Sequence, residues 1–399
     1  MRKALVILLL ACIALPVAIA QDEGFNEVES DNYRVLSQVG VNHAARTASK
    51  LEAMLQLYNS YFHFDIDELD AKLRVRIFES KSDFDSYLNR VIGETREDFI
   101  YLHYNDLARS ELVGYYVEGE EFDYSLTHQN FVQYMRAFIA NPPLWLREGF
   151  AVFFEQSQYD SDFETVAYRE NLAWLGTLKD LVQGNTDASL IPMEQMLTID
   201  IETARERINV FYPQAWGMVS FLVNADSRDV NRILWDAISA LHPSASMEEN
   251  ARRINERALK WVDTEFLQET FVDYVMERKS FKGLVEEGMD LYADAEIRTA
   301  EEAFVKATKL RDDNYIPFYY LGLINYDKGN YDLADFYYQE ALNRGADEPL
   351  TYYALGVNAF AANRFDAAEN FLQEVTAAGD TVYRQDAEEL LDRISSSSS

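Results

Sequence analysis

The sequence predicts an α+β fold in which a small sheet with helices precedes a longer all-helical part that ends in a repeat array. Three patterns in the 399-residue chain predict it. Residues 33–138 mix short segments of alternating apolar and polar residues, typical of half-buried strands, with longer segments whose apolar residues have helical spacing. From about residue 144 to residue 280 helical spacing dominates. Beyond that, small and apolar residues recur every 34 residues.

The first part of the chain is predicted to run strand, helix, strand, helix, strand, strand, helix. Residues 21–31 before it are polar, and we expect them to be flexible. One helix is predicted over Ala44–Tyr61, a second begins after the capping residue Ser80, and a third carries His128 and is ended by Asn141–Pro143. The predicted strands are Tyr33–Ser37, Leu73–Phe78, Phe99–His103 and Leu112–Val117.

The C-terminal third shows one period at four positions. Residues of similar size recur every 34 residues in four series, one of which consists of glycines and begins at Gly288. The small residues in these series would let the two helices of each repeat approach closely. This pattern resembles tetratricopeptide repeats, which implies helix pairs over residues 281–314, 315–348 and 349–382. We expect Gln385–Ile394 to form a polar capping helix and residues 395–399 a disordered tail. The four series are Gly288, Gly322, Gly356; Ala300, Ala334, Ala368; Phe304, Tyr338, Leu372; and Ala307, Ala341, Val375.

The first 20 residues have the pattern of a secretory signal peptide. Arg2 and Lys3 precede an apolar run, and the small residues before Gln21 fit a cleavage site. Residues around Cys12 also resemble a lipoprotein signal, but the apolar run continues well past Cys12, so we favour cleavage before Gln21. Cys12 is the only cysteine, so the mature chain would contain no disulfide and no thiolate site. We expect a periplasmic or secreted protein, with a lipid anchor at Cys12 as the less favoured alternative.

The charge balance limits the classes of partner. The chain has 36 Lys and Arg against 68 Asp and Glu, a formal net charge of −32. Such a chain repels phosphate backbones, so no nucleic-acid partner is expected. Beyond the signal peptide no run of eighteen apolar residues occurs, so we expect no transmembrane segment.

Two segments about twenty residues apart have the pattern of a zinc site that has lost part of its chemistry. Trp145–Ala151 reads WLREGFA and contains Glu148; upstream, His128–Val132 reads HQNFV. The pair resembles gluzincin, or peptidase MA-like, metallopeptidases, in which H-E-x-x-H precedes a helix that supplies the third zinc ligand. Gln133 also fits, since H-E-x-x-H-Q is common there. The resemblance implies a sheet subdomain over residues 21–125 and a helical subdomain over residues 126–280.

By this resemblance, His128 and Glu148 are vestigial metal ligands. Gln129 takes the place of the general base, and an amide cannot accept and return a proton near neutral pH. Val132 replaces the second histidine and has no lone pair to offer a metal. Alternatively, Glu148 pairs with His128 or with an arginine brought near by the fold. Any substitute ligand would come from His103, Asp123, Tyr124 or Glu155, and Tyr212 is expected to be structural.

We therefore expect an exported, non-catalytic peptidase-like protein, a pseudopeptidase, without a cofactor. It would bind protein or peptide partners through the former cleft, where a peptide could add to an edge strand at Leu112–Val117, and through the groove of the repeats. The alternative is a zinc metallopeptidase with a rearranged ligand set. A third possibility is a scaffold in which only the repeats function.

Overall fold

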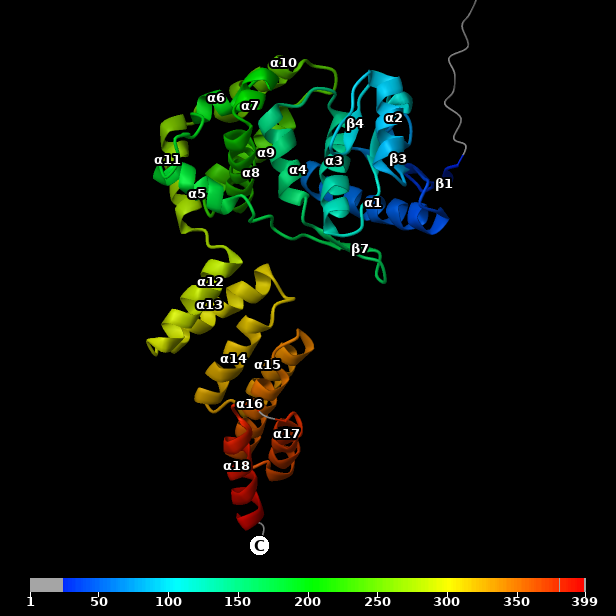
Figure 1. The fold of residues 1–399 in the computed structure, drawn as a ribbon. Helices are drawn as coiled ribbons and strands as arrows, with labels where there is room; N and C mark the ends of the chain where they lie inside the picture. Colours follow the sequence, from blue (N-terminus) through cyan, green and yellow to red (C-terminus); the bar gives the residue numbers. More distant parts are fainter. Residues whose placement is uncertain (1–23, 380, 398–399) are drawn as a thin grey trace, which may run out of the picture. The chain divides into compact units, whose positions relative to one another are not determined.

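The computed structural model describes residues 24–379 and 381–397 (Figure 1). By their internal contacts these residues form two compact units. The first unit comprises the chain up to Pro142 together with Glu155–Tyr168 and Leu241–Met247, and it holds a small mixed sheet. The second unit comprises Pro143–Phe154, Arg169–Ala240 and the chain from Glu248 onward, and it is helical. The predicted α+β class with a mostly helical C-terminal part is confirmed. The predicted signal peptide and Cys12 lie outside the described residues.

The sheet of the first unit has five strands in the order β1-β2-β3-β5-β4. The three central strands β2, β3 and β5 are parallel, and the outer strands β1 and β4 are antiparallel to their neighbours. All four predicted strands are present, β2 and β3 with the predicted bounds. The strands are β1 (Asn26–Glu29), β2 (Tyr33–Ser37), β3 (Leu73–Phe78), β4 (Ile100–Leu102) and β5 (Glu111–Tyr115).

Two predictions about this sheet are wrong. The strand predicted at Leu112–Val117 is not an edge strand, because β5 pairs with β3 on one side and with β4 on the other. Four of its five residues are buried, as expected of an interior strand. The segment 21–31 is not simply flexible, because Asn26–Glu29 forms β1 on the outer side of β2. Its polarity suits an edge strand, where Glu27 pairs with Arg34 of β2 at 2.8 Å.

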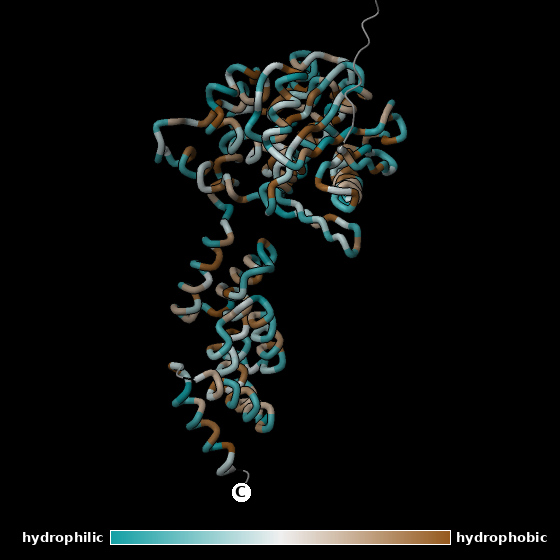
Figure 2. Tube along the Cα trace, turned by 45° about the vertical axis from the view of Figure 1, so that its right-hand side comes forward, coloured by the Kyte–Doolittle hydropathy of each residue, from teal (hydrophilic) through white to brown (hydrophobic). Residues whose placement is uncertain are grey.

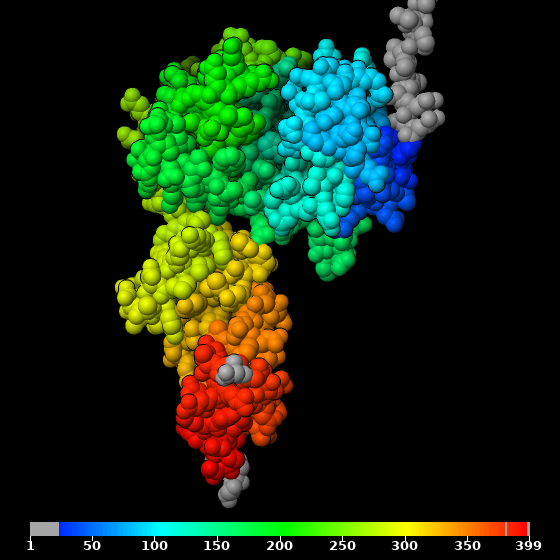
Figure 3. Space-filling model, in the orientation of Figure 1, coloured from blue at the N-terminus to red at the C-terminus, as the bar shows by residue number. Residues whose placement is uncertain are grey.

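Helices of the first unit pack on this sheet. Ser80 caps α2 as predicted, since its hydroxyl accepts a hydrogen bond from the Asp83 amide at 3.2 Å. The Tyr58 ring of α1 meets the Phe131 ring of α3 edge-to-face, with centroids 5.1 Å apart. The β6–β7 hairpin packs on α1 and protrudes as a small lobe (Figure 3). These elements are α1 (Val41–Phe62), η1 (Ile66–Glu68), α2 (Lys81–Ile92), η2 (Leu107–Arg109), α3 (Glu120–Phe138), β6 (Gln158–Asp160) and β7 (Thr165–Ala167).

The second unit begins with a bundle in which α4 and α8 lie closest together. A Cβ added to Gly149 of α4 would come within 2.5 Å of the Ala215 carbonyl oxygen of α8, so only glycine allows this approach. Trp145 and Trp216 are buried in the two helices. The bundle consists of α4 (Leu144–Phe154), α5 (Leu175–Gln183), α6 (Met193–Leu197), α7 (Ile201–Glu206), α8 (Ile208–Asn224), α9 (Arg228–Ala240), α10 (Met247–Ile254), the π-helix η3 (Asn255–Leu259) and α11 (Thr264–Glu277).

Each of the three 34-residue periods contains two helices. The glycine of each helix pair packs against the large residue of another series. A Cβ on Gly322 would lie 2.5 Å from the Tyr338 ring. The corresponding distances are 2.8 Å from Gly288 to Phe304 and 2.7 Å from Gly356 to Leu372. The predicted close approach is thus confirmed. Hydrophobic and hydrophilic residues alternate along these helices (Figure 2). They are α12 (Phe281–Ala293), α13 (Ile297–Leu310), α14 (Tyr315–Asp327), α15 (Tyr331–Asn343), α16 (Glu348–Ala361) and α17 (Phe365–Ala377).

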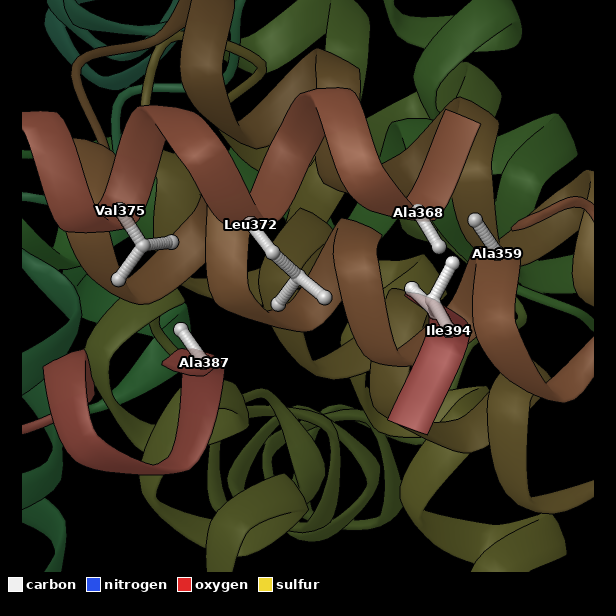
Figure 4. Close-up of a cluster of buried hydrophobic side chains, with 6 residues drawn as sticks. All are labelled: Ala359, Ala368, Leu372, Val375, Ala387 and Ile394. Carbon is white, nitrogen blue, oxygen red and sulfur yellow. The ribbon is translucent and has the colours of Figure 1, made fainter. Parts of the chain in front are cut away.

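A final helix, α18 (Arg384–Ser397), covers the last pair. Its Ala387 and Ile394 are buried against Leu372 and other apolar residues of α16 and α17 (Figure 4). The predicted capping helix is present and extends further than expected. The predicted disordered tail is wrong for residues 395–397, which continue the helix, because Ser395 and Ser396 donate side-chain hydrogen bonds to the Asp392 carbonyl.

Candidate functional site

The two segments that resemble a zinc site, His128–Val132 and Trp145–Ala151, are called the degenerate motif below. Its first half, His128–Val132, lies on α3, in the sheet unit. The His128 side chain is 15% exposed, and its Nδ1 lies 3.9 Å from Oε2 of Glu155. Val132 is buried among the apolar residues of α3, while Gln129 is half-buried. Val132, which the resemblance matches to the second histidine of H-E-x-x-H, is thus an apolar side chain without a lone pair.

The neighbouring polar residues of α3 attach the helix to the sheet. Nε2 of Gln133 donates to the Arg74 carbonyl of β3 at 2.8 Å. Nδ2 of Asn130 donates to the Tyr33 hydroxyl of β2 at 3.0 Å. Both amides are buried, and these bonds satisfy their NH2 groups, whereas Oδ1 of Asn130 has no hydrogen-bond partner among the described residues. Gln133, which fits the peptidase pattern, makes a structural contact here.

The second half of the motif lies on α4, in the helical unit. Oε1 of Glu148 accepts a hydrogen bond from Nε of Arg147 at 2.7 Å, and the second guanidinium nitrogen lies at 2.6 Å. Oε2 of Glu148 accepts from the Tyr212 hydroxyl of α8 at 3.4 Å. Glu148 is 7% exposed. Both carboxylate oxygens thus have protein donors. The arginine that pairs with Glu148 is its neighbour in the helix rather than one brought near by the fold.

Of the four substitute ligands, Asp123 and Tyr124 make other contacts. Asp123 pairs with Lys50 at 2.5 Å, and the Tyr124 hydroxyl donates to Glu120 at 2.9 Å. The His103 ring lies 5.8 Å from that of Tyr101. Among residues 24–379 and 381–397 there is no group of three or more His, Cys, Asp or Glu side chains that could hold a metal. The convergence of the two halves of the motif stays a prediction.

The sheet unit also contains a cleft of about 550 Å³, which we call the α1–α3 cleft. It lies between one face of α1, the start of α3 and the beginning of the β6 strand. The helical spacing of α1, which is readable from the sequence, places His43, Arg46 and Lys50 on one of its faces. The residues on the other side of the cleft come from distant segments of the chain, so no local signal in the sequence predicted them. The cleft is lined by His43, Arg46, Thr47, Lys50, Tyr116, Val117, Gly119, Glu120, Phe122, Asp123, Tyr124, Leu126, Ser157, Gln158 and Tyr159.

The charged groups of the α1–α3 cleft differ in their surroundings. Burial lowers the pKa of Lys50, and the adjacent Asp123 carboxylate opposes that effect. Burial also lowers the pKa of His43, whose Nδ1 lies 3.0 Å from the Ser37 hydroxyl. Arg46 is exposed and has no ion-pair partner within the described part of the chain.

No model of a known protein family matches this chain, and no curated protein is similar enough to count as a match. In the part of the chain that the structure describes, no helix is both long and apolar enough to cross a membrane. The chemistry of the sites therefore rests on their own residues and geometry.

Proposed function

We propose that this chain is an exported, non-catalytic peptidase-like protein that binds protein or peptide partners. Binding would use the region of the degenerate motif and the helices of the repeats. The observation that carries the proposal is the arrangement of Glu148, whose carboxylate is bonded to Arg147 and Tyr212.

The chemistry of the motif supports a non-catalytic role. A metal ligand at Glu148 would have to give up a close charged pair with Arg147. The second histidine position is the buried, apolar Val132, and the general-base position is an amide. A catalytic zinc site needs three protein ligands and a group that moves a proton, and this motif offers two ligands and no such group.

A peptide that adds to the sheet would pair with β4 rather than with β5. The Ile100–Leu102 strand is antiparallel to β5 and has no second strand neighbour among the described residues. Main-chain hydrogen bonds to an outer strand supply affinity in this type of recognition, and side-chain pockets supply specificity. With three residues, β4 offers few such bonds, so most of the affinity would have to come from elsewhere.

The repeats supply a second surface for a protein partner. Leu333 and Phe336 lie three residues apart on α15 and are 43% and 53% exposed. Large apolar residues that are adjacent and exposed on one helix often mark a protein contact. Binding here would depend on the repeats and not on the region of His128 and Glu148.

Metal analysis and a peptidase assay test the non-catalytic role. Purified wild-type protein should carry no stoichiometric zinc and should cleave neither casein nor a peptide library, with and without added zinc. A metallopeptidase of known activity, assayed in parallel, provides the positive control. One zinc per chain, removed by a chelator together with proteolysis, would establish the alternative, a zinc metallopeptidase with a rearranged ligand set.

A further inference from the structure

We propose that the α1–α3 cleft binds the free α-carboxylate of an amino acid or of a peptide C-terminus. This site lies entirely on the sheet unit and uses none of the residues of the degenerate motif. It goes beyond the proposed function, because it names a ligand chemistry and a position for it.

Two sets of donors converge on the cleft. Arg46 presents a guanidinium without an ion-pair partner among the described residues, and a guanidinium can bind a carboxylate with two parallel hydrogen bonds. The cleft also contains the start of the 19-residue helix α3, where Gly119 provides no side-chain cap. The first backbone amides of a helix lack partners within the helix and favour an anion.

A buried hydroxyl is the independent sign of a ligand. Ser157 lines the cleft, is 6% exposed, and its Oγ has no hydrogen-bond partner among the described residues. Leaving a buried hydroxyl unbonded costs about 1–3 kcal/mol, so native proteins rarely tolerate it without a partner. A carboxylate oxygen in the cleft would accept that hydrogen bond.

The charged residues that line the α1–α3 cleft favour a ligand with a single negative charge and a positive or amide group next to it. The lining cations Arg46 and Lys50 are matched by the carboxylates of Glu120 and Asp123. Because Lys50 and Asp123 neutralise each other at 2.5 Å, Arg46 and Glu120 remain for a ligand. Phosphate, with more than one negative charge at pH 7, would be repelled by Glu120 and by a chain of net charge −32 more strongly than a carboxylate with a single negative charge.

The size and walls of the cleft suit a short peptide end as well as a single amino acid. Its volume of about 550 Å³ lies within the range of small-molecule sites. Tyr116 and Val117, each 37% exposed, lie at the cleft and would contact an apolar side chain next to the carboxylate. Capture of a terminal carboxylate by backbone amides is a known mode of peptide recognition.

Affinity selection on the immobilised full-length protein tests the proposal. The probes are a randomised tripeptide pool with free carboxyl ends, the same pool with amidated ends, free leucine, and inorganic phosphate as a competitor. We expect the free-carboxyl pool to be enriched at least tenfold over the amidated pool. Competition by leucine as strong as by the tripeptides assigns the site to amino acids, and weaker competition assigns it to peptide ends.

Three variants separate binding from folding. Arg46→Gln should weaken binding of the enriched peptides at least tenfold with the melting temperature unchanged. Ser157→Ala should weaken binding several-fold and leave the melting temperature unchanged or raised, because it removes a buried hydroxyl without a partner. Arg90→Gln is the matched control, because Arg90 is an exposed arginine of α2 outside the cleft and should leave binding unchanged. Equal enrichment of amidated peptides, full binding by Arg46→Gln, or displacement by phosphate at equal concentration would each overturn the proposal.

Discussion

The contact between α4 and α8 allows one substitution to be predicted in detail. In Gly149→Ala, the new Cβ would lie 2.5 Å from the Ala215 carbonyl oxygen and 2.7 Å from Cγ2 of Val219. A backbone oxygen cannot turn away as a side chain can, so the two helices would have to separate. The substitution tests whether the segment that resembles a peptidase ligand helix is kept for packing.

Two terms of opposite sign set the size of the effect. Overpacking in a rigid core costs about 1–3 kcal/mol, and we take about 3 kcal/mol because the clash is with backbone. Replacing glycine by alanine within a helix returns about 1 kcal/mol. Gly149→Ala should therefore lower the free energy of unfolding of the helical unit by about 2 kcal/mol.

Urea unfolding followed by tryptophan fluorescence measures this change, since the buried Trp145 and Trp216 belong to the two helices in contact. The matched control is Gly176→Ala in α5, where a new Cβ meets nothing within 4 Å. It should leave the urea midpoint unchanged or raise it slightly. If Gly149→Ala behaves like Gly176→Ala, α4 and α8 do not pack as closely as described, and the glycine has another role.

Three further predictions concern the motif, the repeats and the cleft. Gln129→Glu combined with Val132→His should lower the free energy of unfolding by about 1–3 kcal/mol without metal. Zinc should raise the melting temperature of this double variant and not that of wild type. A folded double variant that binds no zinc would show that the resemblance misplaces the motif. A chain truncated after Arg278 should stay folded by circular dichroism and lose the main partner in a pull-down, and retained binding would exclude the repeats as the interaction surface. Asp123→Asn should cost about 1–2 kcal/mol at neutral pH, because it removes the charged partner of the buried Lys50 ammonium while solvent screens the 58% exposed Asp123 side chain. Since burial holds the pKa of Lys50 below its ordinary 10.5, the unfolded chain binds more protons, and this deficit should shrink as the pH of the urea titration rises toward 10.5; a deficit that does not change with pH would contradict this account.

The candidate site was predictable from the sequence only in part. The sequence placed His128 and Glu148 on two successive helices, because residue spacing and the prolines after α3 are local signals. It also left the choice between an arginine and His128 as the partner of Glu148 open. The contact with Arg147 joins neighbouring residues of α4 and depends on side-chain orientation, whereas the contact with Tyr212 depends on how α4 packs against α8.

The sequence by itself determined the order of strands and helices and the 34-residue period with its close helix contacts. Both follow from patterns that repeat within a few residues or at a fixed interval, so each segment carries its own signal. Only the tertiary structure decided which strands are at the edge of the sheet: β1 is an edge strand, and β5 lies between β3 and β4. It also brought Ser157 to the same cleft as Arg46. Strand neighbours and cleft walls come from segments far apart in the chain, and long-range packing rather than local periodicity selects them.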